Sequence, residues 1–159
     1  YFSFDFSTQF GYLLATRHGI DVTSNSYGSS TADNDGYDPA SQEADILYSG
    51  SRTTPLFSTG NGAPGSGTAT APQPLAGIAT GASTQFGGTG WDSIKNESQI
   101  VDNDVMVWSN RGPQATGGNG VDVVADGAFA PGHKTLNTAL DRHVAWETWG
   151  GTSPEYPRS

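Results

Sequence analysis

Predicted helices and strands alternate through the first part of this chain, and the connections between them are short. Residues 6–18 carry apolar side chains at a helical spacing, while residues 20–28 begin with β-branched residues and end in small ones. The next predicted helix covers residues 40–48, and the next strand covers residues 54–59. Because alternating helices and strands with short connections build parallel sheets, we expect an α/β fold.

The second half of the chain carries further strand patterns, separated by glycine–proline pairs. These strands are expected at residues 75–83, 105–109, 121–124 and 144–149. No internal repeat interrupts them, and 159 residues is the length of one domain. The glycine- and proline-rich stretch 60–74 is short and lies between strands, so we interpret it as a loop beside a site.

Composition narrows the possible functions. With 34% hydrophobic residues, 22 glycines and 9 prolines the chain is rich in turns, yet 4 Trp, 7 Phe and 6 Tyr suffice for a core. The net charge of -9 and the scattered cations argue against a nucleic-acid surface. The sequence has no cysteine for a disulfide or a thiolate metal site. It has no visible leader segment and no apolar run of about 20 residues, so we expect no membrane span.

Two predicted strands end in small polar residues, at positions 24–28 and 58–61. In open α/β sheets, ligands bind outside the carboxyl ends of the strands. Two such ends side by side would form the floor of a cleft with accessible backbone N–H and C=O groups. The sequence therefore predicts a substrate-binding edge at these two segments.

Five short motifs follow one another along the chain. They are VTSNSYG from residue 22, FSTGNG from residue 57, SNRGP from residue 109, DVVADG from residue 122 and GGTSPEYP from residue 150. In order and spacing they resemble the C-terminal half of the catalytic domain of the subtilisin-like serine peptidases, the subtilases. The resemblance implies a three-layer α/β fold with a parallel sheet, present over residues 1–159 as a partial domain. It also implies the activity of a serine endopeptidase.

The resemblance assigns the catalytic residues. Ser153 falls at the position of the family's nucleophile, and Asn61 falls at the position of its oxyanion-hole asparagine. A serine at the start of a helix exposes its hydroxyl, and its own N–H points toward a developing oxyanion. A neutral carboxamide such as that of Asn61 can donate the second hydrogen bond.

The same resemblance implies that a polypeptide substrate lies between two walls of small residues. The residues expected to bind the substrate are Ser26, Tyr27, Gly28, Ser58, Thr59, Gly60 and Thr152. Glycine lets a peptide approach the backbone closely. The substrate would add as an extended strand through main-chain hydrogen bonds.

The aspartate and histidine of the family's triad lie outside the matching segments. In the family both precede the first helix predicted here, and His18, His133 and His143 occupy none of the family positions. The helix that follows the nucleophile in the family is missing as well. A serine without its base is a poor nucleophile, so this stretch alone is expected to be inactive. We expect the N-terminal part of the same domain to supply both residues, in the same chain or as a separate one.

The sequence leaves a second interpretation open. Ser153 would then serve only as a helix N-cap, and Asn61 only as a turn residue. Residues 154–156 are Pro-Glu-Tyr where the family has small residues, and residues 126–131 look like a short insertion. These departures favour a non-catalytic subtilase-like module for binding or structure.

An acidic turn is a candidate calcium site. Asp33, Asp35 and Asp38 lie close together in the sequence, and carboxylates are calcium ligands. The turn lacks the spacing and the distal glutamate of an EF-hand, so a solvated acidic turn is the alternative. Asp102 and Asp104 raise the same question more weakly. The reaction itself requires no cofactor, and the family resemblance implies secretion to the outside of the cell or to its envelope.

Overall fold

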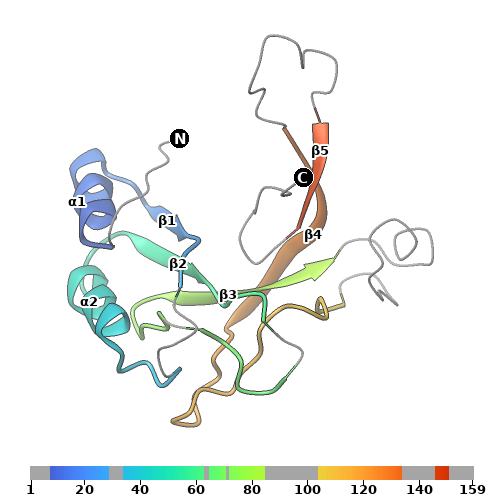
Figure 1. The fold of residues 1–159 in the computed structure, drawn as a ribbon. Coiled ribbons are helices and arrows are strands. Elements are labelled where there is room, and N and C mark those ends of the chain that lie inside the picture. Colours follow the sequence, from blue (N-terminus) through green and yellow to red (C-terminus); the bar gives the residue numbers. More distant parts are fainter. Residues whose placement is uncertain are drawn as a thin grey trace.

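The computed structural model describes residues 8–28, 34–62, 65–70, 72–84, 104–133 and 146–150. Within these ranges the chain forms a five-stranded sheet with two helices beside it, as Figure 1 shows. The elements are α1 (Thr8–His18), β1 (Val22–Asn25), α2 (Pro39–Tyr48), β2 (Thr54–Ser58), β3 (Ile78–Thr84), β4 (Val123–His133) and β5 (Trp146–Gly150). The predicted alternation of helices and strands in the first part of the chain is therefore confirmed.

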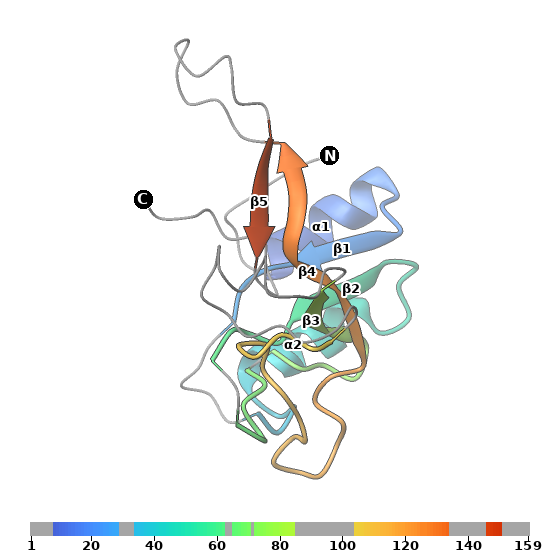
Figure 2. The same cartoon turned by 90° about the vertical axis from the view of Figure 1, so that its right-hand side faces the viewer.

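The sheet follows the order of the chain, from β1 at one edge to β5 at the other. Strands β1 to β4 pair in parallel, and β5 pairs antiparallel with β4. The expected α/β fold with a parallel sheet holds for the first four strands, and the last strand runs against them. Figure 2 shows β4 and β5 side by side, and the pair projects away from α2 and from the rest of the sheet.

Helix α1 ends where the sequence predicts. Gly19 has a positive φ of 63°, a conformation that a side chain disfavours and glycine accepts. The N–H of Gly19 donates to Thr16 O at 3.3 Å, and the N–H of Ile20 donates to Ala15 O at 2.9 Å. This pair of bonds is the Schellman arrangement, which satisfies carbonyls at the end of a helix and turns the chain toward β1.

Helix α2 begins at a capped proline. The Asp38 carboxylate accepts hydrogen bonds from the backbone N–H groups of Ala40 and Ser41, both at 3.1 Å. Pro39 occupies the first turn, where its missing N–H costs nothing. The cap fixes the start of α2 next to the core.

The largest buried cluster joins α2 to the sheet. Ala44, Tyr48 and Phe57 are buried together, and Tyr12 from α1 packs edge-on against Tyr48 with ring centroids 5.2 Å apart. Because Phe57 packs against residues of both helices, its side of the sheet is the face that the helices cover. Side chains of successive residues in a strand point to opposite faces, and paired residues share a face, so the residues of β1 and β2 can be assigned to one face or the other. The opposite face is open within the described part of the chain, with Val22 54% and Val123 47% exposed. Of the three layers expected, the structure thus describes the sheet and one layer of helices.

The segment 105–109 is not the strand that its β-branched residues predicted. Val105 makes one isolated antiparallel bridge to Ser83, and the chain then turns. The physical reason is that β3 continues past the end of β2, which leaves N–H and C=O groups of β3 to be satisfied. Met106 N–H donates to Ala82 O at 3.0 Å, and the Ser109 hydroxyl accepts from Ala82 N–H at 2.9 Å.

Strand β4 is longer than predicted. The expected strand 121–124 begins instead at Val123 and runs to His133, through the residues that looked like a short insertion. Residues 126–131 therefore continue the sheet, with a register shift between Ala128 and Ala130. Among the described residues, neither helix has the length and apolar character that crossing a bilayer requires.

Candidate active site

The two predicted cleft segments leave the sheet side by side. Asn25, the last residue of β1, is paired with Phe57 near the end of β2. Residues 26–28 and 59–61 follow these positions directly, at the carboxyl edge of the same two strands (Figure 1). This adjacency is the arrangement that the two small polar strand ends predicted.

The segment 26–28 is exposed and is anchored by one aromatic residue. Ser26 and Gly28 are exposed, and Tyr27 is 38% exposed. The Tyr27 hydroxyl lies 2.6 Å from the hydroxyl of Thr8, and its ring packs edge-on against Phe57 at 6.1 Å between centroids. Partial burial raises the pKa of the Tyr27 phenol, an effect that the hydrogen bond to Thr8 opposes.

The segment predicted as the opposite wall, residues 58–60, turns the side chain of Thr59 away from the surface. Ser58 is half-buried, and Thr59 is 1% exposed because its side chain points into the protein. The N–H and the hydroxyl of Thr59 both donate to Thr80 O, at 3.1 and 3.3 Å. The hydroxyl and the main-chain groups of Thr59 are thus all bonded within the protein, which fixes the position of this segment.

Gly60 makes the turn that presents Asn61. Its φ of 93° lies in the left-handed region, and a Cβ there would come within 2.4 Å of the side-chain nitrogen of Asn110. Only glycine satisfies both conditions. Asn61 follows in an exposed position, as a hydrogen-bond donor to an oxyanion must.

The backbone on either side of Asn61 is bonded to Asn110. The Asn110 carboxamide donates to Thr59 O at 2.8 Å and accepts from Gly62 N–H at 2.6 Å. The backbone N–H of Asn110 donates to Gly60 O at 2.9 Å. Asn110 belongs to the SNRGP motif, which was predicted without a role for this residue and was the signal that could have identified it.

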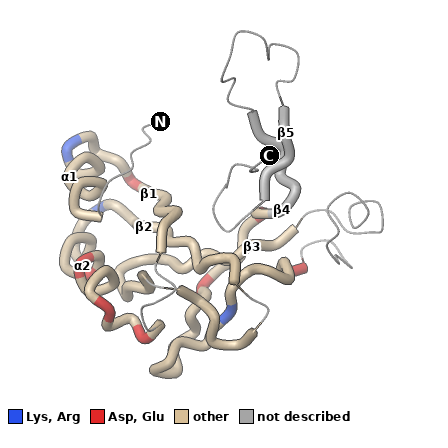
Figure 3. Tube along the Cα trace, in the orientation of Figure 1, with Lys and Arg blue, Asp and Glu red and all other residues tan. Residues whose placement is uncertain are grey.

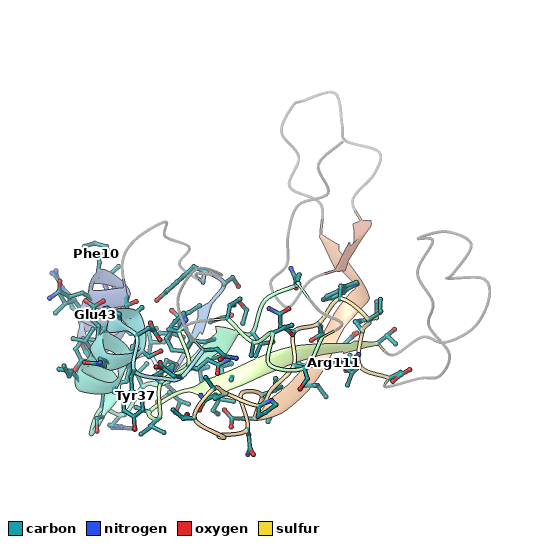
Figure 4. All side chains as sticks on the ribbon, turned by 60° about the horizontal axis from the view of Figure 1, so that its bottom comes forward. Phe10, Tyr37, Glu43 and Arg111 are labelled. Atoms are coloured by element: carbon teal, nitrogen blue, oxygen red, sulfur yellow. The ribbon has the colours of Figure 1, made fainter. Side chains whose placement is uncertain are left out.

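Residues further along the stretch that carries Asn61 are bonded to Arg111, the neighbour of Asn110. Thr68 N–H and Ala69 N–H both donate to Arg111 O, at 2.8 and 3.0 Å, and the Thr68 hydroxyl accepts from Arg111 N–H at 3.0 Å. Residues 68 and 69 of the predicted loop 60–74 therefore lie against the SNRGP segment. Figure 4 shows Arg111 near β3, remote from Phe10 and Glu43 on the helical side.

Charge is sparse around the edge that carries Asn61. Among the described residues, Lys and Arg are represented only by Arg17, Arg52 and Arg111, and Figure 3 shows two of the three basic positions on the side of α1. The side chains that bond to the backbone on either side of Asn61, those of Asn110 and Thr70, are neutral. A site of this kind can stabilise a transient negative charge through dipoles without binding an anion permanently.

The acidic turn uses its described carboxylates locally. Asp35 accepts from the N–H of Tyr37 at 2.8 Å, and Asp38 caps α2 and also accepts from the Ser41 hydroxyl. Asp104 accepts from Val105 N–H at 2.9 Å. No group of three or more metal-ligating side chains occurs in the part of the chain that the structure describes. Asp33 and Asp102 lie outside the described residues, and a calcium site stays a prediction.

The predicted nucleophile also lies outside the described residues. The description ends at Gly150 in β5, three positions before Ser153, and Thr152 and His143 are likewise outside it. His18 is exposed at the end of α1, and His133 ends β4. The part of the candidate site that the structure describes is therefore the predicted substrate-binding edge, which includes Asn61.

Comparison with known proteins identifies the class of this fold. The model of the Subtilase family matches residues 5–154, so the chain belongs to the subtilases. No curated protein matches the chain. The structure resembles a mutant of the protease domain of PatA, with 18% sequence identity, a TM-score of 0.56, and coverage of 89% of this chain and 42% of that one.

A second solved structure is similar to the same extent. It is the prenylagaramide maturation protease PagA, with 18% identity, a TM-score of 0.58, and coverage of 96% of this chain and 46% of that one. At this identity the two likenesses establish the subtilisin-like α/β fold. The chain spans less than half of the length of either protease structure.

Proposed function

We propose that this chain is part of a serine endopeptidase that hydrolyses peptide bonds through an acyl-enzyme on Ser153. The observation that carries the proposal is the edge formed by β1 and β2, where Asn61 is exposed on a turn whose neighbouring residues are fixed. Membership of the subtilase family supports a peptidase. The order of the five motifs supports the assignment of Ser153 and Asn61.

The proposed reaction has two steps. A histidine from another segment takes the proton of the Ser153 hydroxyl while its oxygen attacks the scissile carbonyl. The carbonyl oxygen becomes an oxyanion that accepts hydrogen bonds from Asn61 and from the N–H of Ser153. The C–N bond then breaks, and the leaving amine takes the proton from the histidine. Water attacks the resulting ester by the same route and restores the free serine.

A polypeptide would bind as an extended strand along residues 26–28. Exposed Ser26 and Gly28 leave the backbone accessible to main-chain hydrogen bonds. Tyr27 forms one wall of the pocket for the side chain before the scissile bond, and the main chain of residues 58–60 forms the other. Thr152 completes the binding residues beside the nucleophile.

The remainder of the catalytic domain would cover the open face of the sheet. Val22 and Val123 are both about half exposed there, and among the described residues β1 is paired on one side only. An apolar face and an open strand edge together favour a covering segment of the same domain. That segment would supply the aspartate and the histidine, and the complete enzyme would act outside the cell or in its envelope, with calcium as an optional stabiliser.

Covalent labelling tests the proposal. The complete protein, with the aspartate- and histidine-bearing segment present, is treated with a fluorophosphonate and digested for mass spectrometry. We expect the label on Ser153 and none in the Ser153→Ala variant. A folded complete protein without label would refute the peptidase and favour the non-catalytic module, which the Pro-Glu-Tyr sequence at residues 154–156 motivates.

A further inference from the structure

One buried side chain fixes the turn that carries Asn61. Asn110 is 2% exposed, and its carboxamide is bonded at both ends, to Thr59 O and to the N–H of Gly62. Its backbone N–H reaches Gly60 O. Thr59, Gly60 and Gly62, on either side of Asn61, are thus all bonded to Asn110, which lies about 50 positions further along the chain.

The surroundings leave this turn little freedom. Thr59 O also accepts from the N–H and the hydroxyl of Thr70, at 2.9 and 3.1 Å. The Asn110 side-chain nitrogen occupies the space that a Cβ on Gly60 would need. A carbonyl held by three donors and a turn packed against an amide cannot rotate without breaking several buried bonds.

We infer that Asn110 is a positioning residue, which holds Asn61 where its carboxamide meets the oxyanion; this role rests on the proposed peptidase function. An oxyanion donor is effective only when it is already aimed before the charge develops. A displacement of about 1 Å in such a group can cost about 100-fold in rate. Asn110 itself is buried and does not touch the substrate.

The kinetic test uses the complete protease with Asn110→Ala. We expect kcat to fall about 10- to 100-fold while KM changes less than about threefold, because substrate binding uses residues 26–28 and transition-state binding uses Asn61. The matched control is Gln73→Ala. Gln73 is a 3% exposed amide that donates to Gly120 O at 3.0 Å, and it has no bond to the Asn61 turn. The Gln73→Ala enzyme should be less stable than the wild type and should have the same kcat.

A double-mutant cycle separates positioning from a general loss of structure. If Asn110 acts through Asn61, then adding Asn110→Ala to an Asn61→Ala enzyme should change kcat less than about threefold. If Asn110→Ala lowered kcat by the same factor in the wild type and in the Asn61→Ala enzyme, the proposal would be overturned. An Asn110→Ala enzyme with the kcat of the wild type would overturn it as well.

A second variant serves if Asn110→Ala does not fold. Asn110→Asp keeps the size of the side chain and an acceptor for Gly62 N–H, but it loses the donor to Thr59 O. Its rate of fluorophosphonate labelling, corrected for the folded fraction, should fall at least about 10-fold. A rate equal to that of the wild type would refute the role of Asn110 alone. An unlabelled wild type would instead refute the peptidase function, and with it this role.

Discussion

The hydroxyl of Tyr27 lies 2.6 Å from the hydroxyl of Thr8, so the segment proposed to bind substrate is tied to the first turn of α1. Tyr27 also packs edge-on against Phe57, which belongs to the main core cluster. The proposed pocket wall is therefore continuous with the core. Changes to this residue should be visible in stability as well as in binding.

The first prediction removes the Tyr27 hydroxyl. Tyr27→Phe keeps the ring contact and loses the hydrogen bond to Thr8, so the free energy of unfolding should fall by about 1 kcal/mol. Urea unfolding of the complete protein measures this change. Tyr37→Phe is the control, because Tyr37 is 68% exposed and should be neutral. Equal stabilities for Tyr27→Phe and the wild type would show that the bond contributes nothing.

Alkaline pH should destabilise the protein through two tyrosines. Burial raises the pKa of both Tyr27 and Tyr48 above their ordinary value of about 10. The folded state keeps these protons where the unfolded chain releases them. The contribution of the two protonated tyrosines to the free energy of unfolding is therefore complete below about pH 10. It is lost as the pH rises toward their pKa values in the folded protein. The Tm should fall less steeply above about pH 10 in the double variant Tyr27→Phe, Tyr48→Phe; an unchanged slope would contradict the prediction.

Substitution of Gly60 should be costly and that of Gly62 mild. Gly60→Ala forces a side chain into a positive φ and against the Asn110 amide, so we expect a loss of at least about 1–3 kcal/mol and a lower kcat. A Cβ at Gly62 would lie 3.3 Å from the Asn110 side-chain oxygen, which a small shift relieves. Thermal unfolding and kcat of the two variants should differ clearly, and similar losses would argue against a fixed turn.

The cap of α2 should matter for stability and not for catalysis. Asp38→Ala leaves the N–H groups of Ala40 and Ser41 without their acceptor, at a cost of about 1–2 kcal/mol. Asp38→Asn retains an acceptor oxygen and should remain within about 0.5 kcal/mol of the wild type. Chemical unfolding measures both variants. A kcat that falls in parallel with the stability of Asp38→Ala would contradict a purely structural role for this cap.

Asn61 should act in the transition state. Asn61→Ala is expected to lower kcat about 100- to 1000-fold with little change in KM, the range known for the oxyanion-hole asparagine of subtilisin itself. Steady-state kinetics on a peptide substrate provides the measurement. Ser58→Ala, on the neighbouring wall, should alter KM more than kcat. An Asn61→Ala enzyme with normal kcat would remove Asn61 from the mechanism.

Elements set by local signals could be predicted from the sequence. The end of α1 at Gly19 and the strands β1 and β2 each carry a turn or a β-branched run within a few residues. Helix α2 was predicted from residue 40, one residue after its observed start at Pro39. The adjacency of residues 26–28 and 59–61 followed from the parallel order of those strands. The positions of Ser153 and Thr152 remain predictions.

Features that depend on distant partners could not be predicted. Segment 105–109 has strand-forming residues, but its conformation follows from how far β3 extends beyond β2. The side chain of Thr59 is turned inward by bonds to Thr80, 21 positions away. Asn110 meets Thr59 across 51 positions. No local pattern encodes such contacts, since they arise when the loops come together over the sheet.

The long sequence separation of the Asn110 bridge has a consequence for the order of folding. Contacts between remote segments form late, after the cost of closing the intervening chain has been met. The turn that carries Asn61 therefore acquires its shape only once β3 and the SNRGP segment have assembled. The proposed oxyanion site would therefore take shape only in the folded domain, after these remote segments have met.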